Sequence, residues 1–391
     1  MNTITVDMID GLINDLIRKN VYSDFKGYDP YDFSSSQWSI LGNPGTGIKS
    51  RLSYLNKVSP VNLRILLKIP KTPNAKANAL FLHSLALLDH KLYEKEINRL
   101  FNWFLENRPA EFGQYFSSGF SFKISLSGYS SGPGKTSLII SLFTAYALIE
   151  LYCKTGNTDY LDPVISFRRL IGDKLPSYED KETLCYSYHF DRFDETYNAT
   201  AKIGRMYALL YKHVSQDEDY RDKIRKILNY LSTKQRIDGS WPYSDTLDYS
   251  DSFHTAFILE SIHVMLQVCN DDPRYQQMYD QGLADYKTGF FYNGVPVHFH
   301  RNHNKAGGRG IIGVELRDCA NAVILFTITR DMQAASETLA WTLRNLTAPD
   351  KVYFYKNRFW TSRIDFIRWN AWLLYTLVIY RNGLKPLQII K

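Results

Sequence analysis

A carboxylate and an imidazole three residues apart form the most promising proton-transfer pair in this sequence. Asp251 and His254 stand in the string DSFHTAF, at the start of an apolar stretch with helical spacing. Two residues three apart in a helix share one face, and a carboxylate there can orient an imidazole that exchanges protons near neutral pH. The alternative interpretation is structural: Asp251 caps the helix and His254 belongs to the core.

Three further charged residues are candidates for completing such a site. Glu315 and Arg317 begin a second apolar helix. If the helices close into a ring, Asp251 and Glu315 can face each other as two carboxylates do in glycoside hydrolysis. Arg317 and Arg368 can hold a substrate carboxylate or phosphate through the guanidinium fork. Either arginine can equally form an ordinary surface ion pair.

The remaining histidines are weaker candidates. His189 and Asp191 precede a predicted helix and are further candidates for substrate contacts. The histidines at 298, 300 and 303 have no cysteine or carboxylate at the spacing of zinc ligands, so we expect no metal and no cofactor.

The string GYSSGPGKTS differs from the phosphate-binding loop GxxxxGK[ST] by one residue, and it predicts a loop that starts a helix.

The elements that must position these residues are helices. Apolar residues recur at helical spacing in about a dozen segments. These segments are 60–69, 77–90, 92–107, 137–156, 159–171, 194–213, 217–234, 251–269, 273–286, 314–329, 331–346 and 365–381.

From residue 137 onward two kinds of helix alternate. Residues 138–149, 253–268 and 320–327 are apolar on all sides, whereas 220–231 and 273–286 carry one apolar stripe. This alternation predicts an all-α fold of helical hairpins, an (α/α) toroid with short β or loop insertions, in one domain over residues 1–391. Because the period does not report closure, an open solenoid is the alternative.

Composition indicates a packed globular protein, and the first residues do not predict a signal peptide. Hydrophobic residues make up 45% and charged residues 22%, and the 47 basic and 40 acidic residues are interspersed, with a net charge of +7. This pattern favours an anionic substrate and argues against nucleic acid.

Four cysteines stand far apart, and residues 1–20 lack the pattern of a signal peptide. The longest apolar stretch, 138–151, is shorter than the roughly 20 residues that span a bilayer. We therefore expect a cytoplasmic protein with no integral membrane segment.

Gln235, Gly239 and Trp241 have the spacing Q-x3-G-x-W. This string resembles the QW signature of squalene-cyclase and prenyltransferase-like α/α toroids, where the Gln and Trp tie the end of an outer helix to the next loop. The resemblance implies a structural role first. Aromatic rings also offer broad apolar planes to sugars, so Trp241 and Tyr243 are candidates for stacking on a glycan. The chain has no DxDD motif of a terpene cyclase.

Several longer strings are similar to α/α-toroid proteins encoded in bacterial capsule, O-antigen and exopolysaccharide gene clusters. They are KGYDPYD, DGSWPYSD with DSFHTAFILE, FFYNGVPVHF before VELRDCANAV, and FYKNRFWTSRIDFIRWNAWLLYTL. The resemblance covers nearly the whole chain and implies a glycan-handling protein of surface-polysaccharide biosynthesis. One departure is that Glu315-Leu316-Arg317 stands where that group typically shows Asp-x-His.

These observations predict a carbohydrate-active enzyme that acts by epimerisation, elimination or hydrolysis in a central cavity. Its partners would be an oligosaccharide, a nucleotide-sugar or a lipid-linked glycan. Asp251 and His254 would transfer protons, with Glu315 as the second carboxylate. Two alternatives stay open: a non-catalytic glycan-binding or scaffold protein of the same pathway, and a toroid that handles isoprenoids in a wide apolar cavity.

Overall fold

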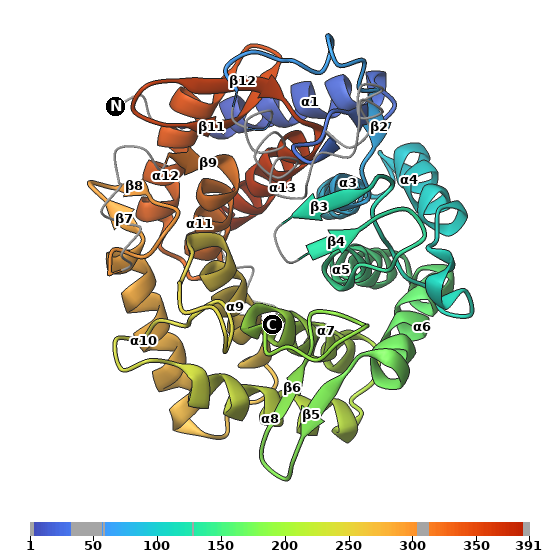
Figure 1. The fold of residues 1–391 in the computed structure, drawn as a ribbon, viewed down its shortest axis with the longest axis vertical. Coiled ribbons are helices and arrows are strands. Elements are labelled where there is room, and N and C mark those ends of the chain that lie inside the picture. The colour runs from blue at the N-terminus through green and yellow to red at the C-terminus, as the bar shows by residue number, and fades with distance from the viewer. Residues whose placement is uncertain (1–3, 33–56, 58, 127–128, 303–312, 386–391) are drawn as a thin grey trace. The chain divides into compact units, whose positions relative to one another are not determined.

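The fold is seen in a computed structural model that describes residues 4–32, 57, 59–126, 129–302 and 313–385. Twelve α-helices lie within these residues (Figure 1). They are α1 (Val6–Tyr22), α3 (Ala75–Asp89), α4 (Glu94–Glu106), α5 (Leu138–Thr155), α6 (Thr158–Lys174), α7 (Tyr197–His213), α8 (Glu218–Lys234), α9 (Ser252–Met265), α10 (Pro273–Gly289), α11 (Leu316–Ile328), α12 (Met332–Leu346) and α13 (Ile367–Gly383).

Eleven of the twelve expected helical segments are present within a few residues of their predicted ends. Local capping accounts for many of the starts: the side chains of Asn74, Asp217 and Asp272 accept hydrogen bonds from the first-turn amides of α3, α8 and α10. Helix α1 was not predicted, although Ile9, Ile13, Leu16 and Ile17 follow a helical period and are buried.

The predicted helix over 60–69 is wrong. The chain forms turns there, and Lys68 has a φ of 48°, which ends any helical path. The apolar pattern misled because Ile65 and Leu66 are exposed, whereas Arg64, which pairs with Asp32, and Ile69 are buried. An ion pair and one apolar side chain therefore anchor the segment.

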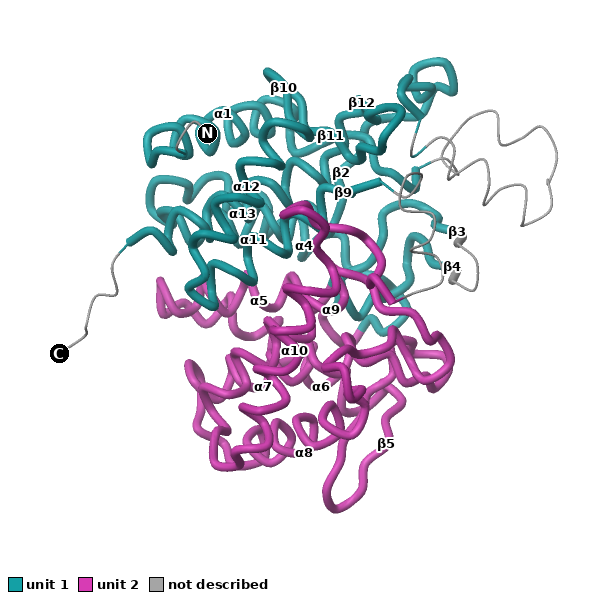
Figure 2. The backbone as a smooth tube through the Cα atoms, turned by 90° about the vertical axis from the view of Figure 1, so that its left-hand side faces the viewer, with its two compact units in different colours: residues 1–113, 117–140, 313–391 teal, residues 114–116, 141–312 magenta. Residues whose placement is uncertain are grey.

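The chain forms two compact units (Figure 2). Unit 1 comprises residues 1–113, 117–140 and 313–391, and unit 2 comprises residues 114–116 and 141–312. The expectation of a single toroid domain stays a prediction.

In unit 2, α7 and α9 pack side by side, and α8 and α10 flank them (Figure 1). Nearly every side chain of α9 is buried, whereas α8 buries a single stripe that includes Tyr220, Ile224 and Leu231. The predicted alternation of fully buried and amphipathic helices is thus confirmed for these elements. Two short hairpins, β5 (Ser177–Glu179) with β6 (Leu184–Tyr186) and β7 (Phe291–Tyr292) with β8 (Val295–Pro296), lie in the connections.

In unit 1, α13 is the buried centre, packed against α3, α11 and α1. A small antiparallel sheet stands beside it: β11 (Lys351–Lys356) pairs with β10 (Thr347–Ala348), β12 (Thr361–Asp365) and β9 (Val314–Glu315). Two-stranded pairs join β1 (Lys26–Gly27) to β2 (Thr72–Pro73) and β3 (Ile124–Leu126) to β4 (Tyr129–Ser131). The sheets are small, and the all-α class is confirmed.

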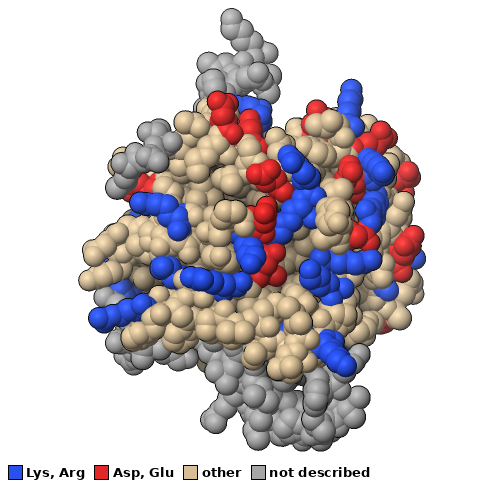
Figure 3. All heavy atoms as spheres, turned by 90° about the horizontal axis from the view of Figure 1, so that it is seen from above, with Lys and Arg blue, Asp and Glu red and all other residues tan. Residues whose placement is uncertain are grey.

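Charge and hydropathy are distributed as the sequence suggests. On the face drawn in Figure 3, basic and acidic side chains are intermixed. Within the described part of the chain, α5 is the one helix whose length and composition would allow it to cross a membrane. Of this 18-residue apolar stretch, 72% is buried within the fold.

Candidate functional site

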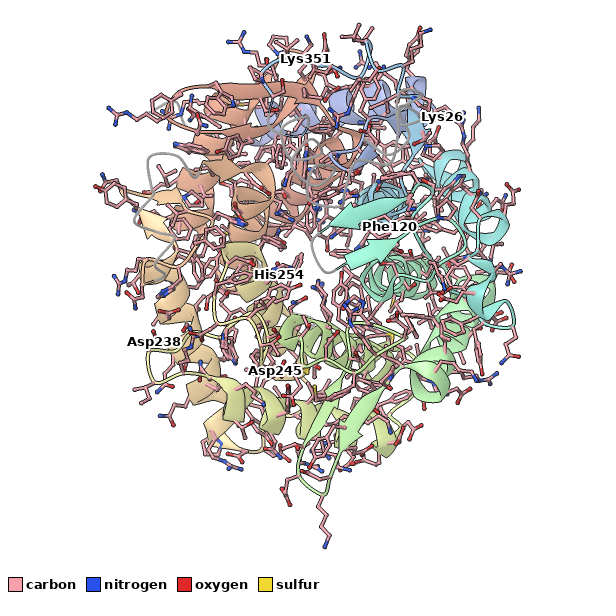
Figure 4. All side chains as sticks on the ribbon, in the orientation of Figure 1. Lys26, Phe120, Asp238, Asp245, His254 and Lys351 are labelled. Carbon is pink, nitrogen blue, oxygen red and sulfur yellow. The ribbon has the colours of Figure 1, made fainter. Side chains whose placement is uncertain are left out.

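The predicted proton-transfer pair is assembled at the first turn of α9, where Figure 4 labels His254. Asp251 is the N-cap residue, and its Oδ1 accepts a hydrogen bond from the backbone N–H of His254 at 2.9 Å. Its Oδ2 lies 2.6 Å from Nδ1 of the same histidine. One carboxylate therefore has both predicted roles: Oδ1 caps the helix, and Oδ2 orients the imidazole.

The two members of the pair differ in exposure. The Asp251 side chain is 3% exposed and the His254 side chain is 21% exposed. Burial raises the pKa of Asp251, but the adjacent His254 and His298 outweigh burial and hold the net pKa below its ordinary value. The carboxylate therefore stays ionised and holds Nδ1, which fixes the orientation of the imidazole.

Aromatic side chains surround His254. The ring of Tyr243 meets the imidazole edge-on with centroids 4.8 Å apart, and Tyr249 stacks on Tyr243 at 5.3 Å. Phe253 stacks in turn on His298 at 5.9 Å. The backbone holds this group together because the N–H of Ser252 donates to the carbonyl of His298 at 2.9 Å. Tyr243 is half-buried.

Trp241 must be reassigned from sugar stacking to a structural role. Its indole is 1% exposed, and its Nε1 donates to the carbonyl of Leu231 at the end of α8. Its ring also lies against Gly282 of α10, so no face remains for a sugar. Gln235 donates to the carbonyls of Gly239 and Met278, at 3.0 Å and 2.8 Å. The motif thus ties the end of α8 to the next loop and to α10.

His189 and Asp191, the two candidates for substrate contacts, differ in their surroundings. Asp191 is exposed, whereas Asp194 lies 3.6 Å from Nε2 of His189. The guanidinium of Arg192 also lies 2.8 Å from that nitrogen. Burial lowers the pKa of His189, Asp194 opposes the shift, and the net pKa is below its usual value. His189 therefore belongs to a local loop network rather than to a pair with Asp191.

The other histidines named from the sequence have separate positions. His300 is buried and its Nε2 lies 2.9 Å from Oδ1 of Asp285, in contact with Gly289 of α10. His298 is half-buried beside Phe253, and His303 lies outside the described residues. No group of three potential metal-ligating side chains is present among the residues described.

Glu315 lies at the centre of a charged cluster in unit 1. Its Oε1 accepts from Nζ of Lys57 at 3.3 Å, and its Oε2 lies 2.7 Å from Nη2 of Arg317. Burial lowers the pKa of Lys57, but Glu315 and Tyr31 together outweigh burial and hold that pKa above its ordinary value. The three groups together carry one net positive charge.

Arg368 and Tyr31 extend this cluster. Arg368 is buried, and its Nη2 lies 2.7 Å from Oδ2 of Asp29. Its guanidinium also lies over the ring of Tyr31, 5.3 Å from the centroid, and Nζ of Lys57 lies 5.4 Å from that centroid. Burial raises the pKa of the Tyr31 phenol, but the neighbouring cations outweigh burial, so the net pKa lies below its ordinary value.

Both arginines predicted to hold an anion thus already pair with internal carboxylates. The sequence analysis missed Lys57 and Asp29 as their companions. One signal was available: KGYDPYD places Tyr31 between Asp29 and Asp32 in a string already singled out. Asp251 lies in unit 2 and Glu315 in unit 1, and the expectation that they face each other stays a prediction.

Comparisons with known proteins identify the fold. No family model and no curated protein matches the chain. Among solved structures, cellobiose 2-epimerase from Bacillus thermoamylovorans B4167 is 14% identical, with a TM-score of 0.64 over 95% of this chain and all of that one. A sugar epimerase from a ruminal bacterium is 12% identical, with a TM-score of 0.61 over 97% of this chain and 99% of that one.

A third structure is a GH76 alpha-mannanase, BT2949 of Bacteroides thetaiotaomicron. It is 14% identical, with a TM-score of 0.57 over 90% of this chain and 98% of that one. At such low identities the likeness shows the fold alone. The predicted (α/α) toroid class is confirmed.

Proposed function

We propose that this protein is a carbohydrate-acting enzyme that moves a proton at a carbon next to a sugar carbonyl, with epimerisation as the outcome. The observation that carries the proposal is the Asp251–His254 pair, in which a buried carboxylate lies 2.6 Å from Nδ1 of a partly exposed imidazole. An imidazole that a buried carboxylate holds in one orientation, and that is partly exposed, suits proton abstraction. The epimerases of similar fold support this choice among the reactions that the fold admits.

The step begins when Nε2 of His254 takes the proton from the carbon. The C–H electron pair becomes the new C=C bond and the carbonyl electrons move onto oxygen, which gives an enolate. Return of a proton to the opposite face of the carbon inverts the centre. Glu315 is our candidate for the second carboxylate, and Tyr243 for the ring that contacts the sugar. Arg317 and Arg368 would hold an anionic group of the substrate by exchanging it for an internal carboxylate.

The substrate we infer is a sugar unit of a bacterial surface glycan, free, nucleotide-linked or lipid-linked, handled in the cytoplasm. The strings that resemble proteins of capsule gene clusters support this finer assignment. A glycan-binding protein without catalysis would use the same aromatic groups, and it would bind sugars without exchanging their hydrogens.

The test is solvent exchange. The protein is incubated in D₂O with glucose, mannose, cellobiose and glucuronate, and proton NMR follows loss of the C–H signal next to the carbonyl carbon. We expect exchange with at least one sugar, and loss of exchange in His254→Gln. The matched control is His263→Gln on the same helix, whose ring contacts Tyr279. The proposal is wrong if no sugar exchanges, or if His254→Gln exchanges as fast as the wild type.

A further inference from the structure

The contact between α7 and α9 has a defined register. Nη1 of Arg205 on α7 donates to Oε2 of Glu260 on α9 at 3.1 Å. One turn earlier on both helices, Nζ of Lys202 lies 3.5 Å from the ring centroid of Phe257. The two helices therefore run parallel here, and one further turn toward their N-termini brings Asn198 to the level of His254.

Lys202 is an unusual residue on this face. It is 1% exposed on a helix whose neighbouring residues, Ala201 and Ile203, are also buried. Its ammonium lies against the rings of Phe257 and Phe143, with Nζ 4.4 Å from the Phe143 centroid. Within the described part of the chain no hydrogen-bond acceptor or carboxylate pairs with Nζ, although a buried ammonium is costly without one.

Asn198 stands four residues before Lys202, on the same face of α7. It is 2% exposed, and its Nδ2 has no hydrogen-bond partner among the described residues. Buried amide donors are nearly always paired. Among the described residues these two buried donors, one turn apart, have no acceptor, so both are available to an oxygen atom from another molecule.

These donors adjoin the proton-transfer pair. The ring of Phe257 that contacts Lys202 also lies 6.2 Å, centroid to centroid, from the imidazole of His254. Asn198 lies one turn nearer still, at the level of His254. An oxygen bound by Asn198 and Lys202 would therefore belong to the molecule on which His254 acts.

We propose that Asn198 and Lys202 form the oxyanion site of this enzyme, which binds the sugar carbonyl oxygen as His254 removes the adjacent proton. This inference rests on the proposed function and adds two catalytic residues to it. As the C–H bond breaks and the C=C bond forms, the carbonyl electron pair moves onto oxygen. The negative oxygen then accepts hydrogen bonds from Nδ2 of Asn198 and from the ammonium of Lys202. No further reactant is needed. The substrate presents a free carbonyl, which is the open-chain form of a reducing sugar or, in a nucleotide-linked or lipid-linked sugar, a keto group on the ring.

The charged groups around Lys202 allow it to serve as such a donor near neutral pH. Burial lowers the pKa of Lys202 to about 7, Glu260 opposes the shift, and Arg205 adds to it. Tyr146 of α5 faces the same ammonium, with its ring centroid 5.9 Å away. The site should therefore lose its proton, and its activity, as the pH rises above about 7.

The experiment compares Asn198→Ala and Lys202→Met with the wild type in exchange kinetics and in binding of D-gluconohydroxamate, whose paired oxygens imitate the enediolate. Lys212→Met is the matched control, because Lys212 is on the same helix and pairs with Gln267 at the surface. Removing one oxyanion donor should lower kcat by about 100-fold with little change in KM. We expect the hydroxamate to bind at least about tenfold more weakly to both variants, and the loss of activity above about pH 7 to disappear in Lys202→Met.

The outcomes separate the two proposals. If no sugar exchanges but hydroxamate binding depends on Asn198 and Lys202, the epimerase assignment fails and the oxyanion site stands. If both variants keep the wild-type affinity, kcat and pH profile, the oxyanion site is wrong and the proposed function is unaffected. Asn198→Ala leaves the Lys202 ammonium in place. If Lys202→Met does not fold, kcat and hydroxamate affinity of Asn198→Ala alone test the oxyanion site.

Discussion

Arg205 on α7 and Glu260 on α9 form a largely buried ion pair, with 3.1 Å between Nη1 and Oε2 and side-chain exposures of 16% and 6%. This pair aligns the two helices that carry Asn198, Lys202 and His254. Lys202 lies at the same contact, is 1% exposed, and has no carboxylate within ion-pair distance among the described residues. Burial of this ammonium lowers the free energy of unfolding, because its desolvation is not offset by a counter-charge.

Lys202→Met should make the protein more stable, and the gain should depend on pH. Replacing a buried charge by an apolar residue of similar volume removes its desolvation penalty, which is worth about 1 to 4 kcal/mol. The folded pKa is about 7 and the ordinary value is 10.5, so between these values the unfolded chain binds more protons and wild-type stability rises with pH. The gain in Tm should be largest at pH 6 and shrink toward pH 10. A lower Tm for Lys202→Met throughout this range would contradict the prediction.

Asp251→Asn should separate the two roles of Asp251. Asparagine caps helices as well as aspartate does, so stability at neutral pH should change by less than about 1 kcal/mol. Hydrogen exchange into the sugar should nevertheless fall, because an amide cannot hold the imidazole as a carboxylate does. Asp251→Ala should also lose the cap, at about 1 kcal/mol in urea unfolding.

The acid side of the stability profile gives a second check on Asp251. Its folded pKa is below the ordinary 3.8, so its contribution is present above that value and is lost as the pH falls through the folded pKa. The Tm difference between the wild type and Asp251→Asn should accordingly narrow below about pH 4. A constant difference down to pH 2 would show that the carboxylate is not stabilised by its surroundings.

Gly282→Ala should destabilise the protein at the buried contact between Gly282 and Trp241. Trp241 is the residue that the sequence had suggested for stacking on a glycan. A Cβ there would lie 2.5 Å from the Trp241 ring, and a buried indole cannot move aside easily. Overpacking of this kind costs about 1 to 3 kcal/mol. Gly172→Ala on α6 is the matched control: no atom lies within 4 Å of its added Cβ, and the helix should become more stable. Chemical denaturation of the two variants should move the midpoint in opposite directions.

Glu315→Gln should weaken unit 1 because it leaves Lys57 and Arg317 without their shared counter-charge. The three side chains are between 10% and 19% exposed. Removal of one partner from a buried ion pair costs about 3 kcal/mol. Lys135, which pairs with Glu111 and is 64% exposed, supplies the control through Glu111→Gln, with an expected loss below about 1 kcal/mol. Equal Tm values for the wild type and Glu315→Gln would show that the cluster does not stabilise the fold.

The helices and the Asp251–His254 pair could be predicted from the sequence because their causes are local. Helical period, N-cap residues and the i, i+3 spacing act within a few turns of the chain. The Gln235 and Trp241 contacts followed the same logic, since their motif resembles a known structural signature. A missed signal of this local kind is Lys202, the one charged residue in the small and apolar run from Ala199 to Gly204.

Only the tertiary structure decided which side chains became partners across long separations. Lys57 meets Glu315 across 258 residues, and Arg205 meets Glu260 across 55. A helical period tells which face is apolar, but it does not tell what covers that face, because packing depends on the neighbouring helices and on the desolvation that they impose. For the same reason only the structure showed that Trp241 is a core residue and that His189 lies beside Asp194.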